Sequence, residues 1–212
     1  MGLYPIFADI HDRLAVIAGG GDVALRKVKS LLEAGARIRI IAPEIQKDII
    51  DLQKQIPGSI EIIKRKYRQG DINGAYIVFA ATGDPEVNKT VFMEAEENQI
   101  LMNSSDDPEN CSFFVPSFGR KGSLVLAVST SGASPAMAAK LRRSLEKNLP
   151  ENIEEVLSSL NEARSVLKSM TNLTQHQRGE ILKKIINDDK LVEELVKKKE
   201  KNELENMIKN LS

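Results

Sequence analysis

The chain has 212 residues, enough for one or two domains, and its 42% hydrophobic and 28% charged residues are those of a globular protein. Thirty acidic and thirty basic side chains cancel, so composition gives no argument for a nucleic-acid or membrane partner. A single cysteine excludes an intrachain disulfide, and two histidines exclude a multi-histidine metal site. No apolar run approaches the roughly 18 residues that span a bilayer, and the first ten residues lack the basic and apolar regions of a signal peptide. We therefore expect a cytoplasmic protein without a resident metal.

The first predicted strand ends in three glycines, and a helical pattern follows over residues 23–34. Gly19, Gly21 and Ala24 have the G-x-G-x-x-A spacing of a dinucleotide-binding turn. Gly19 would permit the tight turn, and Gly21, which has no Cβ, would let a pyrophosphate approach the backbone. The alternative is an ordinary strand-to-helix turn in which Asp22 is a plain N-cap.

A second strand over residues 37–41 is followed by Pro43 and Glu44. Glu44 lies 20 residues after Ala24, about where an acidic side chain accepts hydrogen bonds from a ribose diol. A carboxylate at this position would repel a 2′-phosphate, and no arginine immediately follows it. The pattern therefore favours NAD over NADP as the cofactor.

Up to about residue 102, strands and helices alternate, which predicts a parallel sheet with helices on both faces. The third strand covers residues 60–63, and a nearly continuous apolar run over 75–81 indicates a strand that is buried on both faces. A helix over residues 84–98 and a short fifth strand over 100–102 complete this Rossmann-type α/β unit.

The alternation ends at a polar loop over residues 103–110, where the carboxyl end of the fifth strand would face a ligand. Two strand-like runs over 112–117 and 124–129, joined by residues 118–122, then predict a hairpin. A helix capped by Ser134 follows. From Pro150 the chain is strand-free, with helical patterns that include 175–186 and 191–209.

These patterns predict three domains: an NAD-binding Rossmann domain over residues 1–110, a small α+β dimerisation segment over 111–148, and a helical domain over 149–212. Short motifs support one family in particular, and they occur in order over about residues 3–148. They are Pro5-Ile-Phe, Gly19-Gly-Gly-Asp-Val-Ala with Arg26-Lys27, Leu32-Glu-Ala-Gly-Ala36, Ala80-Ala-Thr82 with Val87-Asn88, Asn103 with Asp106, Pro116-Ser117, Leu126-Ala-Val-Ser129 and Gly132-Ala-Ser-Pro135.

This ordered set resembles the NAD-dependent precorrin-2 dehydrogenase module of siroheme biosynthesis, which occurs alone, fused to a methyltransferase, or as a bifunctional dehydrogenase–ferrochelatase. The resemblance implies a homodimer that associates through the segment after the Rossmann sheet. It implies cofactor contacts at Asp22, Val23, Pro43 and Glu44, in addition to the glycines of the turn.

The same resemblance implies that Asp106 lines the tetrapyrrole site as the acid–base group. Removing a hydride and a proton from precorrin-2 needs a nicotinamide over the carbon and a base for the proton, and a carboxylate at the strand-end crevice can act as that base. The alternative is that Asp106 and its neighbour Asp107 cap the loop before Pro108. Of the other matched residues, we assign Thr82 to the cofactor and Asn103 to the substrate.

The substrate carries eight carboxylates, so its site should be cationic. Candidates are Arg120 and Lys121 at the tip of the predicted hairpin and Lys140, Arg142 and Arg143 on the next helix, of which we choose Arg120, Lys140 and Arg143. Two other functions stay open. The chain could insert Fe²⁺ into sirohydrochlorin, because metal insertion also needs a base, or it could be a non-enzymatic NAD sensor, which the lack of a nucleic-acid element disfavours.

Overall fold

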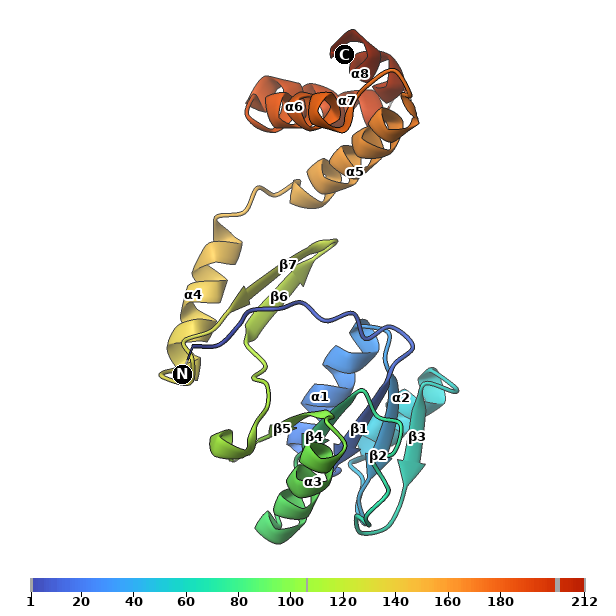
Figure 1. The fold of residues 1–212 in the computed structure, drawn as a ribbon, viewed down its shortest axis with the longest axis vertical. Coiled ribbons are helices and arrows are strands. Elements are labelled where there is room, and N and C mark those ends of the chain that lie inside the picture. Colours follow the sequence, from blue (N-terminus) through green and yellow to red (C-terminus); the bar gives the residue numbers. More distant parts are fainter. Residues whose placement is uncertain (1, 106, 201–202, 212) are drawn as a thin grey trace. The chain divides into compact units, whose positions relative to one another are not determined.

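The computed structural model describes residues 2–105, 107–200 and 203–211. The chain forms two compact units, Met1–Val115 and Pro116–Ser212 (Figure 1). Residues 111–115 belong to the first unit because Phe113 packs against its core, with its ring edge-on to Phe79 at 5.6 Å between centroids. The three-domain division made from the sequence, with boundaries after 110 and 148, stays a prediction.

The first unit is the predicted Rossmann-type sheet, in which five parallel strands are arranged in the order β3-β2-β1-β4-β5. Its elements are β1 (Leu14–Ala18), α1 (Asp22–Glu33), β2 (Arg37–Ile41), α2 (Lys47–Gln55), β3 (Ile60–Ile63), β4 (Ile77–Ala80), α3 (Pro85–Glu97), β5 (Leu101–Ser104) and the short 3₁₀ helix η1 (Pro108–Asn110). The order reverses between β1 and β4, so the crevice expected for a ligand lies at the carboxyl ends of these two strands.

Helices cover both faces of this sheet, as Figure 1 shows. On β1, Ile17 packs into one core with α1 and α2, whereas the preceding Val16 packs into a second core with α3. Both side chains are fully buried. Because successive strand residues face opposite sides, burial of both faces explains why β1 and β4 have continuous apolar sequences rather than alternating ones.

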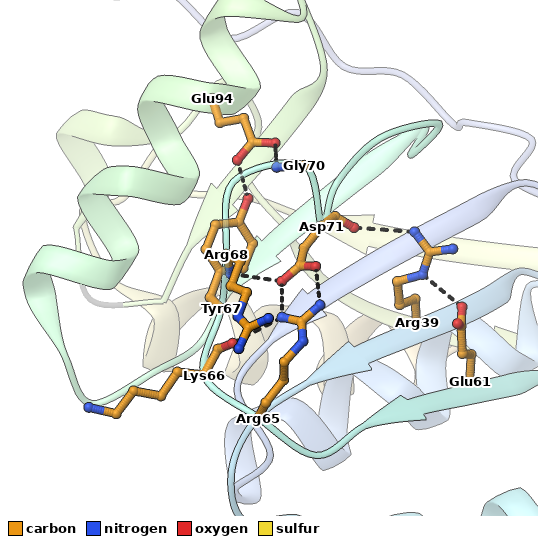
Figure 2. Close-up of polar contacts among 9 residues, drawn as sticks. All are labelled: Arg39, Glu61, Arg65, Lys66, Tyr67, Arg68, Gly70, Asp71 and Glu94. Carbon is orange, nitrogen blue, oxygen red and sulfur yellow. Dashed lines mark hydrogen bonds and ion pairs between the residues drawn. The ribbon is translucent and has the colours of Figure 1, made fainter.

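The loop between β3 and β4 is held by ion pairs that the sequence analysis did not predict (Figure 2). The buried carboxylate of Asp71 accepts two hydrogen bonds from the Arg65 guanidinium, at 2.7 and 2.6 Å, and a third from the Arg68 backbone N–H at 2.8 Å. Arg39 on β2 donates to the Asp71 carbonyl at 3.2 Å and to the Glu61 carboxylate at 2.7 Å. The loop is therefore fastened to the sheet at Asp71.

A second carboxylate fastens the same loop to α3. Glu94 is buried on α3, where one carboxylate oxygen accepts from the Tyr67 hydroxyl at 2.6 Å and the other from the Gly70 N–H at 2.8 Å (Figure 2). Burial, together with the hydrogen bond to Glu94, raises the pKa of the Tyr67 hydroxyl. Tyr67 therefore stays protonated, and its hydroxyl remains a donor to Glu94.

Replacing Asp71 with asparagine should destabilise the first unit by about 1–3 kcal/mol, because the buried Asp71 carboxylate accepts three hydrogen bonds at a site that is only partly shielded from water on the Arg65 side. The hydrogen bond from Arg65 lowers the pKa of Asp71 below its ordinary value of 3.8. Because the pKa of Asp71 is lower in the folded than in the unfolded state, the ionised carboxylate stabilises the fold. This stabilisation is complete above about pH 5 and is lost as the pH falls through the folded-state pKa. Urea unfolding at pH 7 and pH 3 measures both effects.

The matched control for this variant is Asp51→Asn, because Asp51 forms an exposed pair with Lys54 at 3.7 Å. We expect that change to cost no more than about 1 kcal/mol. Equal unfolding free energies for the wild type and Asp71→Asn at pH 7 would show that the Asp71 network does not stabilise the fold.

The second unit begins with the antiparallel strands β6 (Ser117–Lys121) and β7 (Leu124–Val128), followed by α4 (Pro135–Lys147). The predicted hairpin is confirmed, but its predicted first strand over 112–117 is wrong. The turn is Gly122-Ser123, with Gly122 at φ +57°, so residues 118–121 are strand rather than turn. Gly119 lies inside β6, where it pairs with Leu126 of β7, and the Glu146 side chain of α4 occupies the space that a Cβ at Gly119 would take.

In the described part of the second unit, α4 is followed by α5 (Ile153–Ser169), α6 (Gln175–Ile186), α7 (Asp189–Glu200) and α8 (Leu204–Leu211). The sequence predicted one helix over 191–209, and that prediction is wrong, since α7 and α8 are separate. Leu204, Met207 and Ile208 on α8 pack into the core that α5, α6 and α7 form. A single straight helix could not bring this apolar face back onto the same core. No helix in the described ranges is long and apolar enough to cross a membrane.

Candidate dinucleotide-binding site

The glycine turn after β1 packs between the ends of β2 and β4. The Gly19 N–H donates to the Ile41 carbonyl at 2.9 Å, and the Ala81 N–H donates to the Ala18 carbonyl at 2.7 Å. Gly19 has φ +125°, and a Cβ there would lie 2.1 Å from the Ala81 carbonyl oxygen. Only glycine fits this position, so the geometry explains why Gly19 makes the tight turn.

Gly20 is a second tight position, which the sequence analysis missed. A Cβ there would lie 2.2 Å from the Glu44 carbonyl oxygen, and the Gly20 carbonyl accepts from the Gln46 N–H at 2.9 Å. The segment after β2 therefore lies directly against the glycine turn. In the G-x-G-x-x-A fingerprint this residue is an unspecified x, so the motif contains no signal for it.

Gly21 differs from both of its neighbours because a Cβ there would meet no atom within 4 Å. It is the N-cap of α1, and no side chain caps this end of the helix. Three residues on, Ala24 is fully buried in the core. The open space at Gly21 and the uncapped helix N-terminus are what a pyrophosphate needs, so these residues fit a dinucleotide.

Asp22 is the first residue of α1 and not its N-cap, so the N-cap alternative considered for Asp22 is wrong. Its carboxylate instead accepts a hydrogen bond from the Gln46 side-chain amide at 2.7 Å. Beside it, Val23 is half-buried at the start of the helix. Pro43 and Glu44 are exposed just beyond the end of β2. The predicted cofactor residues therefore gather at the carboxyl edge of the sheet.

Thr82 follows β4 at the same edge and is fixed by Asn88 on α3. Its N–H and hydroxyl both donate to Asn88 Oδ1, at 3.3 and 2.6 Å, while Asn88 Nδ2 donates back to the Thr82 carbonyl at 3.2 Å. Asp84 caps α3 by accepting from the Glu86 N–H at 3.0 Å. These bonds give the loop one defined conformation beside the glycine turn.

At the end of β5, Asn103 is buried and donates to the Phe113 carbonyl at 3.1 Å. The Cys111 sulfur accepts from the Ser104 N–H at 3.1 Å and lies 3.2 Å from the Asp107 carbonyl, to which it can donate. Burial raises the pKa of the Cys111 thiol. A neutral, half-buried thiol with these contacts has a packing role.

The predicted acid–base group, Asp106, lies outside the described residues. Its neighbour Asp107 accepts a hydrogen bond from the Asn110 side-chain amide. Among the described residues, no three or more His, Cys, Asp or Glu side chains come together as metal ligands.

Lys27 on α1 is a residue that the sequence analysis matched to the family without giving it a role. Its ammonium lies over the Phe79 ring, 5.0 Å from the ring centroid. Burial lowers the pKa of Lys27, and the neighbouring Arg26 lowers it further. The apolar stripe of α1 could have placed Lys27 beside the core, but only the folded chain puts Phe79 beneath it.

The predicted substrate residues Arg120, Lys140 and Arg143 belong to the second unit, where all three are exposed. Arg120 lies within β6 opposite Val125, not at the hairpin tip. The two candidates that were not chosen have partners: Lys121 donates to the Glu151 carbonyl at 2.8 Å, and the Arg142 guanidinium pairs with Glu146. The three chosen side chains make no ion pair within the described part of the chain.

The chain matches two models of known protein families. Residues 6–117 match the model of a putative NAD(P)-binding domain, and residues 121–148 match the central domain of sirohaem biosynthesis proteins. The chain belongs to this siroheme-biosynthesis family of NAD(P)-binding proteins. The NAD(P)-binding match covers the strands, the glycine turn and the Thr82 loop, so the family's nucleotide domain coincides with the first unit.

Curated relatives in the family include siroheme synthase 1 of Serratia proteamaculans, 37% identical over 178 residues, and a siroheme synthase of Pseudomonas paraeruginosa, 34% identical over 194 residues. These alignments cover 84% and 88% of this chain but only 37% and 41% of the relatives. The chain thus spans about two fifths of their length. The solved structure of SirC, a precorrin-2 dehydrogenase, is 27% identical, with a TM-score of 0.80 over 98% of this chain and 100% of that one.

Proposed function

We propose that this chain is an NAD-dependent dehydrogenase that oxidises precorrin-2 to sirohydrochlorin in siroheme biosynthesis. The observation that carries the proposal is a dinucleotide cradle, open at Gly21, in a chain that aligns with SirC over its whole length. The longer siroheme synthases share the same stretch of sequence.

In the proposed reaction, the bound nicotinamide would supply hydride acceptance. The residues of this chain bind and orient it. The glycine turn and the N–H groups at the start of α1 would hold the pyrophosphate, Glu44 would accept from the ribose hydroxyls, and the Thr82 loop, which is hydrogen-bonded to Asn88, would border the same crevice. Asp106 takes the proton from the macrocycle, and Arg120, Lys140 and Arg143 bind substrate carboxylates.

The test is an anaerobic absorbance assay in which the protein is mixed with precorrin-2 and NAD⁺. Formation of NADH together with the sirohydrochlorin spectrum is the expected result. A second arm adds Fe²⁺ after the oxidation is complete and follows metal insertion into sirohydrochlorin. If the protein binds NAD⁺ but forms no NADH with precorrin-2, the proposed activity is rejected.

Cofactor preference is a separate prediction, based on the exposed Glu44 at the end of β2. NAD⁺ should bind about 5- to 150-fold more tightly than NADP⁺, because the 2′-phosphate would lie against the Glu44 carboxylate. Titration calorimetry with both dinucleotides measures the ratio, and Glu44→Ala should reduce it. Equal or tighter binding of NADP⁺ by the wild type would contradict the assignment of Glu44.

The proposed active form is a homodimer built on the segment from β6 to α4. A two-stranded sheet is only marginally stable alone, and here β6 and β7 pack against α4. On α4, Met137, Leu141 and Leu145 recur at a spacing of four residues and are 46–49% exposed. This apolar stripe is the kind of surface that a second copy would cover.

We expect sedimentation velocity at micromolar concentration to give a dimer for the wild type and a monomer for Leu141→Glu, which places a charge within the stripe. Ala136→Glu puts the same carboxylate on α4 outside the stripe and should leave the dimer intact. A monomeric wild type would reject the dimer.

A further inference from the structure

The start of α1 carries a negatively charged side chain close to where the pyrophosphate should bind. Asp22 is the first helical residue, and the uncapped N–H groups of this turn attract any nearby carboxylate. If the Asp22 carboxylate turned onto them, it would occupy the anion site itself. In the structure it accepts from the Gln46 amide instead, at 2.7 Å.

Gln46 is well placed to hold this carboxylate. It is the N-cap of α2, but its side chain forms no capping bond to α2. Its backbone N–H donates to the Gly20 carbonyl at 2.9 Å, which fixes the residue against the glycine turn. Its side-chain Nε2 then reaches Asp22 on the neighbouring helix.

The Gln46 side-chain amide is oriented by its bond to Asp22. With Nε2 directed at Asp22, the opposite oxygen, Oε1, is buried and has no hydrogen-bond partner among the described residues. A buried acceptor without a partner is unfavourable. The reverse orientation would direct Oε1 at the Asp22 carboxylate, acceptor against acceptor. The bond to Asp22 therefore sets the orientation of the amide.

We propose that Gln46 is a positioning residue for the dinucleotide, which holds the Asp22 carboxylate aside so that the N–H groups of α1 stay free for the pyrophosphate. The proposal rests on dinucleotide binding at this turn and does not depend on whether the chain oxidises precorrin-2. Gln46 acts through Asp22 and does not itself touch the phosphates.

The test is titration calorimetry of NAD⁺ against the full chain, without precorrin-2. Gln46→Leu releases the Asp22 carboxylate and should weaken NAD⁺ binding about 3- to 30-fold. The double variant Gln46→Leu/Asp22→Ala removes the released carboxylate and should bind NAD⁺ about as tightly as Asp22→Ala alone. If the double variant stays as weak as Gln46→Leu, loss of loop structure is the cause and the proposal is overturned.

Two further variants keep the test decisive. Gln53→Leu removes another side-chain bond of α2, to the Ile60 carbonyl at 3.0 Å, and should not change NAD⁺ affinity. Asp22→Asn leaves Gln46 and the backbone N–H of residue 22, through which this residue would contact the cofactor, in place and removes only the side-chain charge. It should bind NAD⁺ at least as tightly as the wild type, whereas clearly weaker binding would overturn the proposal. Because precorrin-2 is absent, failure here is distinguishable from failure of the proposed dehydrogenase activity.

Discussion

Replacing Gly21 with valine is expected to abolish dinucleotide binding while the protein stays folded. Gly21 has φ −89° and ψ −161°, an extended backbone that a β-branched residue adopts readily, and a Cβ there would meet no protein atom. The added side chain would fill the space at the N-terminus of α1 into which the pyrophosphate must fit. We expect NAD⁺ affinity to fall by at least about 100-fold, measured by titration calorimetry, with unchanged circular dichroism.

Two other glycines provide the controls for Gly21→Val. Gly179 on α6 also has open space around its Cβ position, so Gly179→Val makes the same chemical change away from the turn and should leave NAD⁺ affinity unaltered. At Gly19, by contrast, the backbone has φ +125°, and an alanine Cβ would collide with the Ala81 carbonyl oxygen. Gly19→Ala should destabilise the fold by about 1–3 kcal/mol through backbone strain alone. Unchanged NAD⁺ affinity in folded Gly21→Val would show that the turn is purely structural.

Asp106→Asn should slow precorrin-2 oxidation by about 10²- to 10⁴-fold, which is the usual contribution of a general acid–base group. Asparagine is nearly isosteric and keeps one acceptor oxygen, so a loop-capping role would tolerate it, but it cannot accept the proton. NAD⁺ binding should be unchanged, because the cofactor residues lie on other segments. Single-turnover formation of NADH with precorrin-2 measures the step.

The neighbouring carboxylate is the control for Asp106→Asn. Asp107 accepts from the Asn110 amide within the loop, so Asp107→Asn should have a small effect on the rate by comparison. If the chain also inserts metal into sirohydrochlorin, Asp106→Asn should reduce Co²⁺ insertion as well, since one base would act in both reactions. Near-wild-type oxidation by a folded, NAD⁺-binding Asp106→Asn protein would remove Asp106 from the mechanism.

Local residue order was enough to predict the parts of the site that depend on backbone conformation. The strand before Gly19 and the helical pattern after Gly21 located the turn. Gly19 has a positive φ and Gly21 needs open space, so both positions favour glycine and produce a motif that can be recognised in the sequence. The alternation of strands and helices likewise predicted the parallel sheet, since strands buried on both faces show a continuous apolar pattern.

Side-chain partners that lie far apart in the chain could not be predicted in this way. Gln46 lies 24 residues from the Asp22 carboxylate it holds, and Tyr67 lies 27 residues from Glu94. The hairpin shows the same difficulty at short range. The sequence analysis placed residues 118–122 in the connection, whereas pairing with β7 makes 118–121 part of β6 and leaves the turn at Gly122.

The sequence by itself therefore determined the fold class and the dinucleotide turn, which depend on periodicity and on spacing within short segments, and its ordered motifs carried the family resemblance. Only the tertiary structure decided that Asp22 is held by Gln46 instead of capping α1, that a Cβ at Gly20 would collide with the Glu44 carbonyl, and that Asp71 fastens the loop before β4. The physical reason is that hydrogen bonds and close backbone approaches join atoms across strands and helices, and neighbouring residues along the chain do not encode which of those atoms will meet.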